Sequence, residues 1–222
     1  MKNNEKLAFL EKLNEKIEMT DDDLSDEELR ILTTLSKDRD SYYRMCVAEI
    51  LVDFPENQGE RILLNLTNDK DSLVRIFACE SLGYGRSAMV YDKLKKIIKR
   101  DKDCIVRGFS VLAILNIACK LGLEENCLTF LLHVLQKEKM VFTKICLYQA
   151  LYMLGVKGYL CLLANEINTV KYLNRCAVIN SFRDIINDDN REFIKTTLIM
   201  RKEKETTMEV NTAIDTFLQT EF

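Results

Sequence analysis

The chain has 222 residues, of which 47% are hydrophobic and 30% charged, and its formal net charge is −3. It contains one proline and seven glycines, too few for a sheet with many tight turns, so the composition predicts an all-α protein. The longest apolar runs, such as residues 111–119, fall short of a membrane span, and residues 1–5 are polar rather than the apolar core of a signal sequence. We therefore expect a cytoplasmic protein with no membrane partner.

The first expected element is a capping helix over residues 1–19. Its apolar residues recur on one face and the rest of the segment is charged, which suits the terminal element of a stack. The apolar residues are Leu7, Leu10, Leu13 and Ile17. Ser25, with Glu28 three residues later, predicts a capping box at the start of the next helix.

Residues 20–187 predict a single domain built from repeats. A cationic residue recurs one turn into each of five expected helices, at intervals of 31, 32, 37 and 31 residues. Such a regular period is typical of a repeat array, in which each unit buries its apolar face against its neighbours. The five cations are Arg44, Arg75, Arg107, Lys144 and Arg175.

Each cation belongs to the second helix of an expected helical pair. An apolar-periodic stretch precedes each turn, and glycines that suit left-handed helix caps follow the second helices. The stretches span residues 29–35, 62–66, 94–98, 128–135 and 160–167, and the glycines are Gly83, Gly85, Gly122, Gly155 and Gly158. Residues 188–222 predict a sixth, degenerate pair, because apolar residues recur at helical spacing from Val210 to Leu218.

The second repeat carries the most complete motif, which runs Asn68-Asp69-Lys70-Asp71-Ser72-Leu73-Val74-Arg75 and continues to Ala78, Leu82-Gly83 and Gly85. With this motif, residues 26–187 resemble the HEAT repeat family, in its short bacterial, PBS-lyase-like form. The resemblance implies an α-solenoid of about five to six helical pairs with terminal capping helices. The fourth repeat departs from the pattern at Met140 and Lys144, and the fifth departs at Lys171.

The same resemblance implies a structural role for the recurring cations. In the family, an Asp at the turn and an Arg in the second helix bond across neighbouring repeats and hold the stack in register. Asp71 with Arg75 and Asp103 with Arg107 match that role. The expected ladder comprises Asp40, Arg44, Asp71, Arg75, Asp103, Arg107, Lys144 and Arg175.

The resemblance further implies that the second helices line a concave face, where a partner would bind. Residues five and nine positions after each cation, with two aromatic residues two positions after it, are expected to form this groove. The groove residues are Glu49, Asp53, Phe77, Glu80, Tyr84, Phe109, Asn116, Gln149, Asn180 and Asp184. The strip is acidic toward its start and nearly free of Lys and Arg, which favours a basic or mixed protein surface and disfavours nucleic acid.

The sequence offers no recognisable constellation for catalysis. His133 is the only histidine, and neither a glycine-rich phosphate loop nor a G-x-S-x-G motif is present, so we expect no catalytic residues. The eight cysteines form no C-x-x-C pair, so we expect free thiols, no metal and no cofactor.

Two enzyme classes share the HEAT-like architecture and remain as alternatives. A HEAT-like DNA alkyl-base glycosylase would have a basic groove with tryptophans, whereas this chain has no tryptophan and a pI of about 5.5. A bilin lyase-like enzyme shares only the generic repeat pattern. We instead expect a non-enzymatic, monomeric scaffold that binds another protein as an adaptor, inhibitor or regulatory subunit, which includes neutralising a basic toxin or nuclease. A purely structural or self-assembling role is a further alternative.

Overall fold

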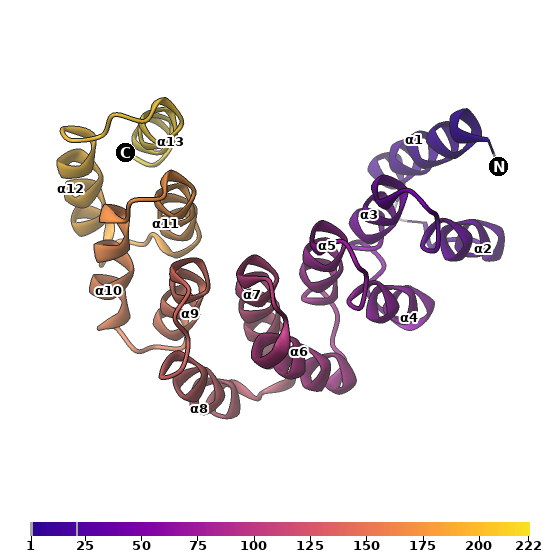
Figure 1. The fold of residues 1–222 in the computed structure, drawn as a ribbon, viewed down its shortest axis with the longest axis horizontal. Helices are drawn as coiled ribbons and strands as arrows, with labels where there is room; N and C mark the ends of the chain where they lie inside the picture. Colours follow the sequence, from indigo (N-terminus) through magenta and orange to yellow (C-terminus); the bar gives the residue numbers. More distant parts are fainter. Residues whose placement is uncertain (1, 21) are drawn as a thin grey trace. The chain divides into compact units, whose positions relative to one another are not determined.

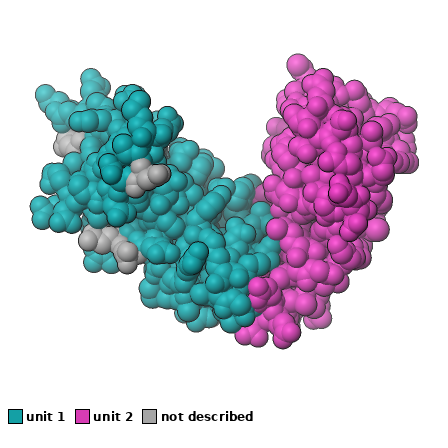
Figure 2. Space-filling view, turned by 180° about the vertical axis from the view of Figure 1, so that it is seen from behind, with its two compact units in different colours: residues 1–123 teal, residues 124–222 magenta. Residues whose placement is uncertain are grey.

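The computed structural model describes residues 2–20 and 22–222, and all the regular secondary structure in these residues is helical. The expected all-α class is therefore confirmed. Contacts divide the chain into two compact units, residues 1–123 and 124–222, which Figure 2 colours separately. The boundary lies inside residues 20–187, which the sequence indicated as one domain.

Unit 1 contains a capping helix followed by three helical pairs. Within this unit, α3, α5 and α7 pack side by side in one layer, and α2, α4 and α6 lie in a second layer (Figure 1). The helices are α1 (Asn3–Met19), α2 (Asp26–Leu35), α3 (Ser41–Ile50), α4 (Asn57–Leu66), α5 (Ser72–Leu82), α6 (Ala88–Arg100) and α7 (Cys104–Leu121).

Side chains at the turns determine where these helices begin. Ser25 and Glu28 form the expected capping box, in which the Glu28 amide donates to Ser25 Oγ at 3.3 Å and the Ser25 amide donates to Glu28 Oε2 at 2.7 Å. Asp40, Asp71 and Asp103 are the N-caps of α3, α5 and α7, and each accepts a hydrogen bond from the backbone amide two residues later. These caps satisfy amides that a helix start would otherwise leave unpaired.

The core of unit 1 lies between its two layers. Fully buried leucines and isoleucines of the first helices face those of the second helices, as the helical spacing of the apolar residues predicted. They include Leu32, Leu35, Leu51, Leu63, Leu82, Leu94, Ile98, Ile114 and Ile117. Gly83 at the end of α5 lies against Ala113 of α7, where an added Cβ would be 2.9 Å from the Ala113 Cα.

Unit 2 repeats the two-layer plan with its own core. α9, α11 and α13 form one layer, and α8, α10 and α12 lie beside it (Figure 1). Phe182 and Phe217 are its largest fully buried side chains. The elements are α8 (Glu124–Leu135), α9 (Val141–Met153), α10 (Tyr159–Asn165), the 3₁₀ helix η1 (Glu166–Asn168), α11 (Tyr172–Ile185), α12 (Arg191–Lys202) and α13 (Met208–Glu221).

One helix among the described residues, α7, is long and apolar enough to cross a membrane. From the sequence, the apolar runs around residues 111–119 had seemed too short, but the helix continues through Cys104–Leu121. Half of this window is buried, and α7 packs on α5 and α6. A buried core helix passes the same test of length and composition.

Gly83→Ala should destabilise the protein by about 1–3 kcal/mol, because the new methyl group meets the Ala113 backbone and the two helices must move apart. Gly158→Ala is the matched control, since Gly158 has a helical backbone and nothing lies within 4 Å of its added Cβ. The control should be neutral or stabilising by up to about 1 kcal/mol. Urea denaturation followed by circular dichroism measures both, and equal effects would refute the close approach of α5 and α7.

Candidate interaction surface and arginine ladder

Two buried arginines in unit 1 bind the next helical pair in the same way. Arg44 donates from Nε and Nη2 to the two carboxylate oxygens of Asp69, at 2.7 and 2.8 Å. Arg75 does the same to Asp101, at 2.8 and 3.0 Å. Each arginine lies in a second helix, and each aspartate lies in the turn of the following pair, so these bidentate ion pairs link neighbouring pairs.

The acidic partners differ from those that the sequence indicated. We expected Asp71 and Asp103 to bond to the ladder arginines, but these residues and Asp40 cap their own helices instead. The carboxylates that bind Arg44 and Arg75 lie two residues before the caps, at Asp69 and Asp101. The Asp71 and Asp103 carboxylates accept hydrogen bonds from amides of their own helices, whereas Asp69 and Asp101 accept from the amides of Asp71 and Asp103 and also bind the arginine of the preceding pair.

Each of these aspartates also contacts the arginine of its own pair. The Asp69 carbonyl accepts a hydrogen bond from Arg75 Nη1 at 2.9 Å, while its carboxylate binds Arg44. Asp101 repeats this arrangement, with Arg107 Nη1 2.9 Å from its carbonyl oxygen. In unit 1 the contacts therefore form a continuous chain from one turn to the next.

Other residues take the place of a ladder arginine at the first pair of unit 1 and in the last pair of unit 2. At the start, Lys6 of α1 forms a 2.6 Å ion pair with Asp38, in the turn before α3. At the end, Asn211 of α13 occupies the position that arginine holds in the other pairs. Its Nδ2 donates to the Glu205 carbonyl at 3.2 Å. Asn211 thus keeps the contact to the turn of its own pair without a charge that needs a carboxylate partner.

We call each bidentate ion pair between neighbouring helical pairs a rung of the ladder. In unit 2 the described residues form one complete rung, between Arg175 and Glu205. The two side chains meet at 2.8 and 3.0 Å, and Arg201 approaches the same carboxylate at 2.7 Å. Burial opposes the charge of Glu205, but the Thr207 amide and both arginines more than offset this effect and lower its pKa to about 2. The sequence indicated Arg175 but not Glu205, which lies in the turn before α13.

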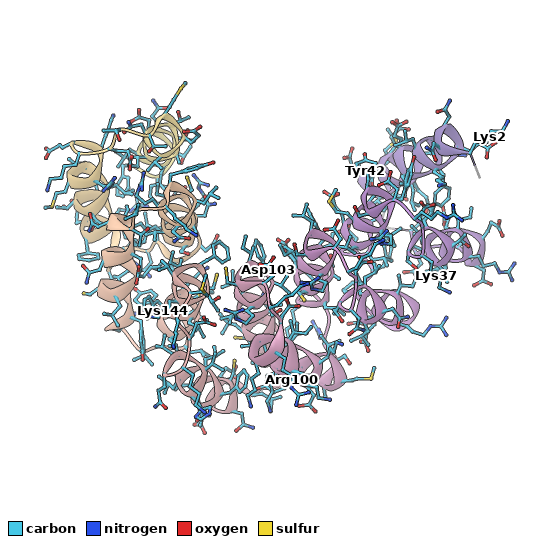
Figure 3. The ribbon with its side chains drawn as sticks, viewed as in Figure 1. Lys2, Lys37, Tyr42, Arg100, Asp103 and Lys144 are labelled. Carbon is cyan, nitrogen blue, oxygen red and sulfur yellow. The ribbon has the colours of Figure 1, made fainter. Side chains whose placement is uncertain are left out.

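The rung at Lys144 is weaker. Lys144 projects from α9 (Figure 3), and Thr169 occupies the place that Asp69 and Asp101 hold in unit 1. Thr169 Oγ1 is buried and has no hydrogen-bond partner among the described residues. Burial raises the pKa of Glu166, and the charge of Lys144 only partly opposes this effect. Lys144 therefore lacks the bidentate contact that the arginines make.

A second set of side chains follows the solvent-exposed face of the same helices. Positions −2, +2 and +5, counted from the ladder cation, share one helical face in α3, α5 and α7, whereas position +9 lies in the turn after α3 and α5 and within α7. We call the apolar residues at the first two positions the apolar shelf, and it comprises Tyr42, Leu73, Ile105, Phe77 and Phe109. The acidic band comprises Glu49, Asp53 and Glu80, which lie at the last two positions.

The shelf is open to solvent at its outer row, where Tyr42 is 49%, Leu73 55% and Ile105 36% exposed. Figure 3 labels Tyr42 near the start of α3 and Asp103 at the start of α7. The sequence indicated Phe77 and Phe109, both half-buried here, but we overlooked the outer row. Extending the same stripe one turn toward the start of each helix would have identified it.

The acidic band lies beside the shelf, and its members Glu49, Asp53 and Glu80 are exposed, as are the predicted Tyr84 and Asn116. Partial burial, and then the negative charge of Glu49, raise the pKa of Glu80. Glu49 on α3 and Glu80 on α5 are therefore close enough to repel each other. None of the three carboxylates forms an ion pair with another described residue.

In unit 2 the predicted groove residues differ from this pattern. Asn180 and Asp184 are exposed on α11, but Gln149 is only 4% exposed and donates from Nε2 to Asp184 Oδ2 at 2.9 Å. Gln149 is thus a packing residue rather than a contact residue. We also overlooked Val170 and Leu173, which expose apolar side chains at the start of α11.

Helix α6, in the first-helix layer of unit 1, carries the opposite charge. Helix α6 presents Lys96, Lys99 and Arg100 as exposed residues, with Lys93 and Lys95 half-buried beside them. Leu64 and Met89 line a shallow cleft of about 450 Å³ with Asp92, Lys93 and Lys96. Helix α6 is thus basic, whereas α2 in the same layer exposes the carboxylates of Asp26 and Glu27.

The described residues contain no group of three or more His, Cys, Asp or Glu side chains that could hold a metal. The His133 ring is exposed and lies 3.3 Å from Lys137 Nζ. Burial raises the pKa of the Cys79 thiol to about 12, so this thiol stays protonated at neutral pH.

No protein-family model matches the sequence, and no curated protein matches it. The function is therefore inferred from the contacts and charges described above.

Glu205→Gln should destabilise unit 2 by roughly 3 kcal/mol at pH 7, because it removes a buried carboxylate whose pKa of about 2 lies below the ordinary value of 4.5. A lowered pKa stabilises the fold above pH 4.5, and this contribution is lost as the pH falls toward 2. The difference from wild type should therefore shrink over that range. Urea denaturation at several pH values measures it, with exposed Glu203→Gln as the control. A constant difference would refute the linkage.

Lys144→Arg combined with Thr169→Asp should complete the weak rung and stabilise unit 2 by about 1 kcal/mol beyond the sum of the single changes. The reason is that the pair would reproduce the geometry of Arg44 with Asp69. Thr196→Asp, on the exposed part of α12, controls for the added charge. A double-mutant cycle by urea denaturation gives the coupling, and a coupling near zero would contradict the assignment of Thr169 to the ladder position.

Proposed function

We propose that the chain is a HEAT-like α-solenoid that acts as a non-enzymatic, cytoplasmic scaffold for another protein. The binding face is assigned to the second helices, which line the concave side in the family that the sequence resembles. The observation that carries the proposal is the apolar shelf, which recurs on α3, α5 and α7 of unit 1, together with the acidic band beside it at α3 and α5. Monomeric proteins seldom leave a contiguous apolar patch exposed unless it serves binding.

The composition of this face suits a protein partner. Tyrosine and phenylalanine side chains are enriched at protein interfaces, and the adjoining carboxylates supply charge complementarity to a basic or mixed surface. The face has few of the cations that neutralise phosphates, which disfavours nucleic acid there. By binding this partner, the chain would act as a regulatory subunit, an inhibitor or an adaptor. A basic toxin or nuclease is one partner with a suitable surface.

The ladder supports the same proposal through rigidity. Its ion pairs are made by the helices that carry the apolar shelf and the acidic band. The spacing of these side chains within unit 1 is therefore fixed before a partner binds. A surface that is already ordered loses little conformational entropy on binding. No second function is proposed, because no described cluster of side chains favours a catalytic role.

Affinity capture from native lysate, followed by mass spectrometry, tests this proposal with three proteins. Wild type and a control with Glu27→Lys and Asp92→Lys should retain the same partner, because both control residues are exposed in the first-helix layer. The surface variant with Glu49→Lys and Glu80→Lys should lose it, since the variant replaces attraction with repulsion. The two variants change the net charge equally.

Equal capture by all three proteins would show that the face is not the binding surface. Recovery of nucleic acid alone would reject the protein-binding proposal itself.

A further inference from the structure

The acidic band is graded across unit 1. At positions +5 and +9, α3 carries Glu49 and is followed by Asp53 in the next turn, and α5 carries Glu80 and is followed by Tyr84. The corresponding residues of α7 are Leu112 and Asn116, which carry no charge. The number of carboxylates in the stripe therefore falls from two to one to none between α3 and α7.

A cation reinforces this gradient at the α7 end. Lys120, near the end of α7, donates from Nζ to the Tyr84 carbonyl, and its Nζ lies 5.9 Å from the centre of the Tyr84 ring. The apolar shelf shows no such gradient, because Tyr42, Leu73 and Ile105 are all exposed. A partner that matches the whole face needs apolar groups along its full length but positive charge only toward α3.

The spacing of the face restricts the shape of this partner. Packed helices lie about 8–10 Å apart, so the three exposed shelf residues recur at about that distance. Along α3 and α5, position +5 of the acidic band lies five residues, or about 7–8 Å, beyond the centre of positions −2 and +2. A partner α-helix repeats one face every seven residues, or about 10.5 Å, which is close to the spacing of the shelf residues from helix to helix. Its diameter of about 10–12 Å is wide enough to cover the shelf and the acidic band together.

We propose that unit 1 binds an amphipathic helix that crosses α3, α5 and α7, with its apolar stripe on the shelf and its basic residues concentrated at the end over α3. This inference rests on the proposed function and specifies the partner's chemistry. The helix repeats its apolar residues at seven-residue spacing, and its Lys or Arg residues face the acidic band. The crowding of Glu49 and Glu80 supports the placement, because a cation between them relieves their repulsion.

The charge gradient also fixes the direction of the bound helix. Turning a helix end for end on a surface exchanges its two edges as well as its two ends. Only one direction therefore places the basic edge on the acidic band and the basic end over α3 at the same time. Two helices with the same composition and the same stripes, but with lysines at opposite ends, should bind with different affinities.

Three fluorescently labelled, alanine-rich peptides of 21 residues test the proposal by anisotropy against the full chain. Two carry leucine every seventh residue, with lysines beside the leucine stripe in either the first or the last two heptads. The third has the same composition as the tighter of these two but has leucine every fifth residue. We expect the two heptad peptides to differ by about ten-fold in Kd, and the third to bind at least ten-fold more weakly than the tighter one.

Charge exchange gives the decisive comparison. Glu49→Lys with Glu80→Lys should weaken the tighter peptide about ten-fold, and a peptide with glutamate in place of each lysine should bind this variant more tightly than wild type. The Glu27→Lys, Asp92→Lys control should bind as wild type does.

Equal affinity of the two heptad peptides would overturn the gradient, and equal affinity of the five-residue-spaced peptide would overturn the helical match. If no peptide binds but the surface variant still loses its captured partner, the helix inference fails while the proposed function stands. If neither the peptides nor the capture respond to the surface variant, both fail.

Discussion

The bidentate contact between an arginine of one helical pair and a carboxylate in the next turn is the interaction on which the architecture of each unit depends. A buried guanidinium is costly unless its donors are paired, and each complete rung pairs three of the nitrogens of Arg44, Arg75 or Arg175. Apolar packing alone would let neighbouring helices slide by a turn at modest cost. The fork geometry of the guanidinium permits only one register.

Lys6 and Asn211 show how a pair is completed without the arginine contact. Lys6 supplies the cation that Asp38 would otherwise receive from a preceding pair, and α1 thereby caps the first pair of unit 1. Asn211 removes the need for a carboxylate beyond α13 and keeps only the contact to its own turn. Lys6 gives the Asp38 carboxylate a cationic partner, and Asn211 carries no charge that needs one. Both arrangements avoid a buried charge without a partner, which would destabilise the fold.

Much of the fold could be predicted from the sequence, because helical periodicity and capping are local properties. The positions of the cations and the Ser25–Glu28 capping box followed from spacing alone. The acidic partners could not be identified in this way, since Asp69 and Asp71 both precede Arg75 closely and only the three-dimensional contacts distinguish the rung from the cap. The outer row of the shelf was missed because an apolar residue near a helix start is equally consistent with burial. The low exposure of Gln149 depends on its contact with Asp184 of the neighbouring helix, which a repeat alignment does not encode.

The ladder and the exposed stripe use different faces of the same helices, and this division explains how a regular stack can carry a specific surface. The cation position is constrained by its neighbours in every pair, so it varies only where the row weakens or ends, at Lys144 and Asn211. In α3, α5 and α7, the side chains at positions −2 and +5 take no part in the ladder contacts and differ from helix to helix. In unit 1 they differ in an ordered way, apolar throughout at one edge and less acidic toward α7 at the other. A rigid spacing with a graded charge selects a partner by both period and direction, which neither a uniform acidic face nor a flexible one could do.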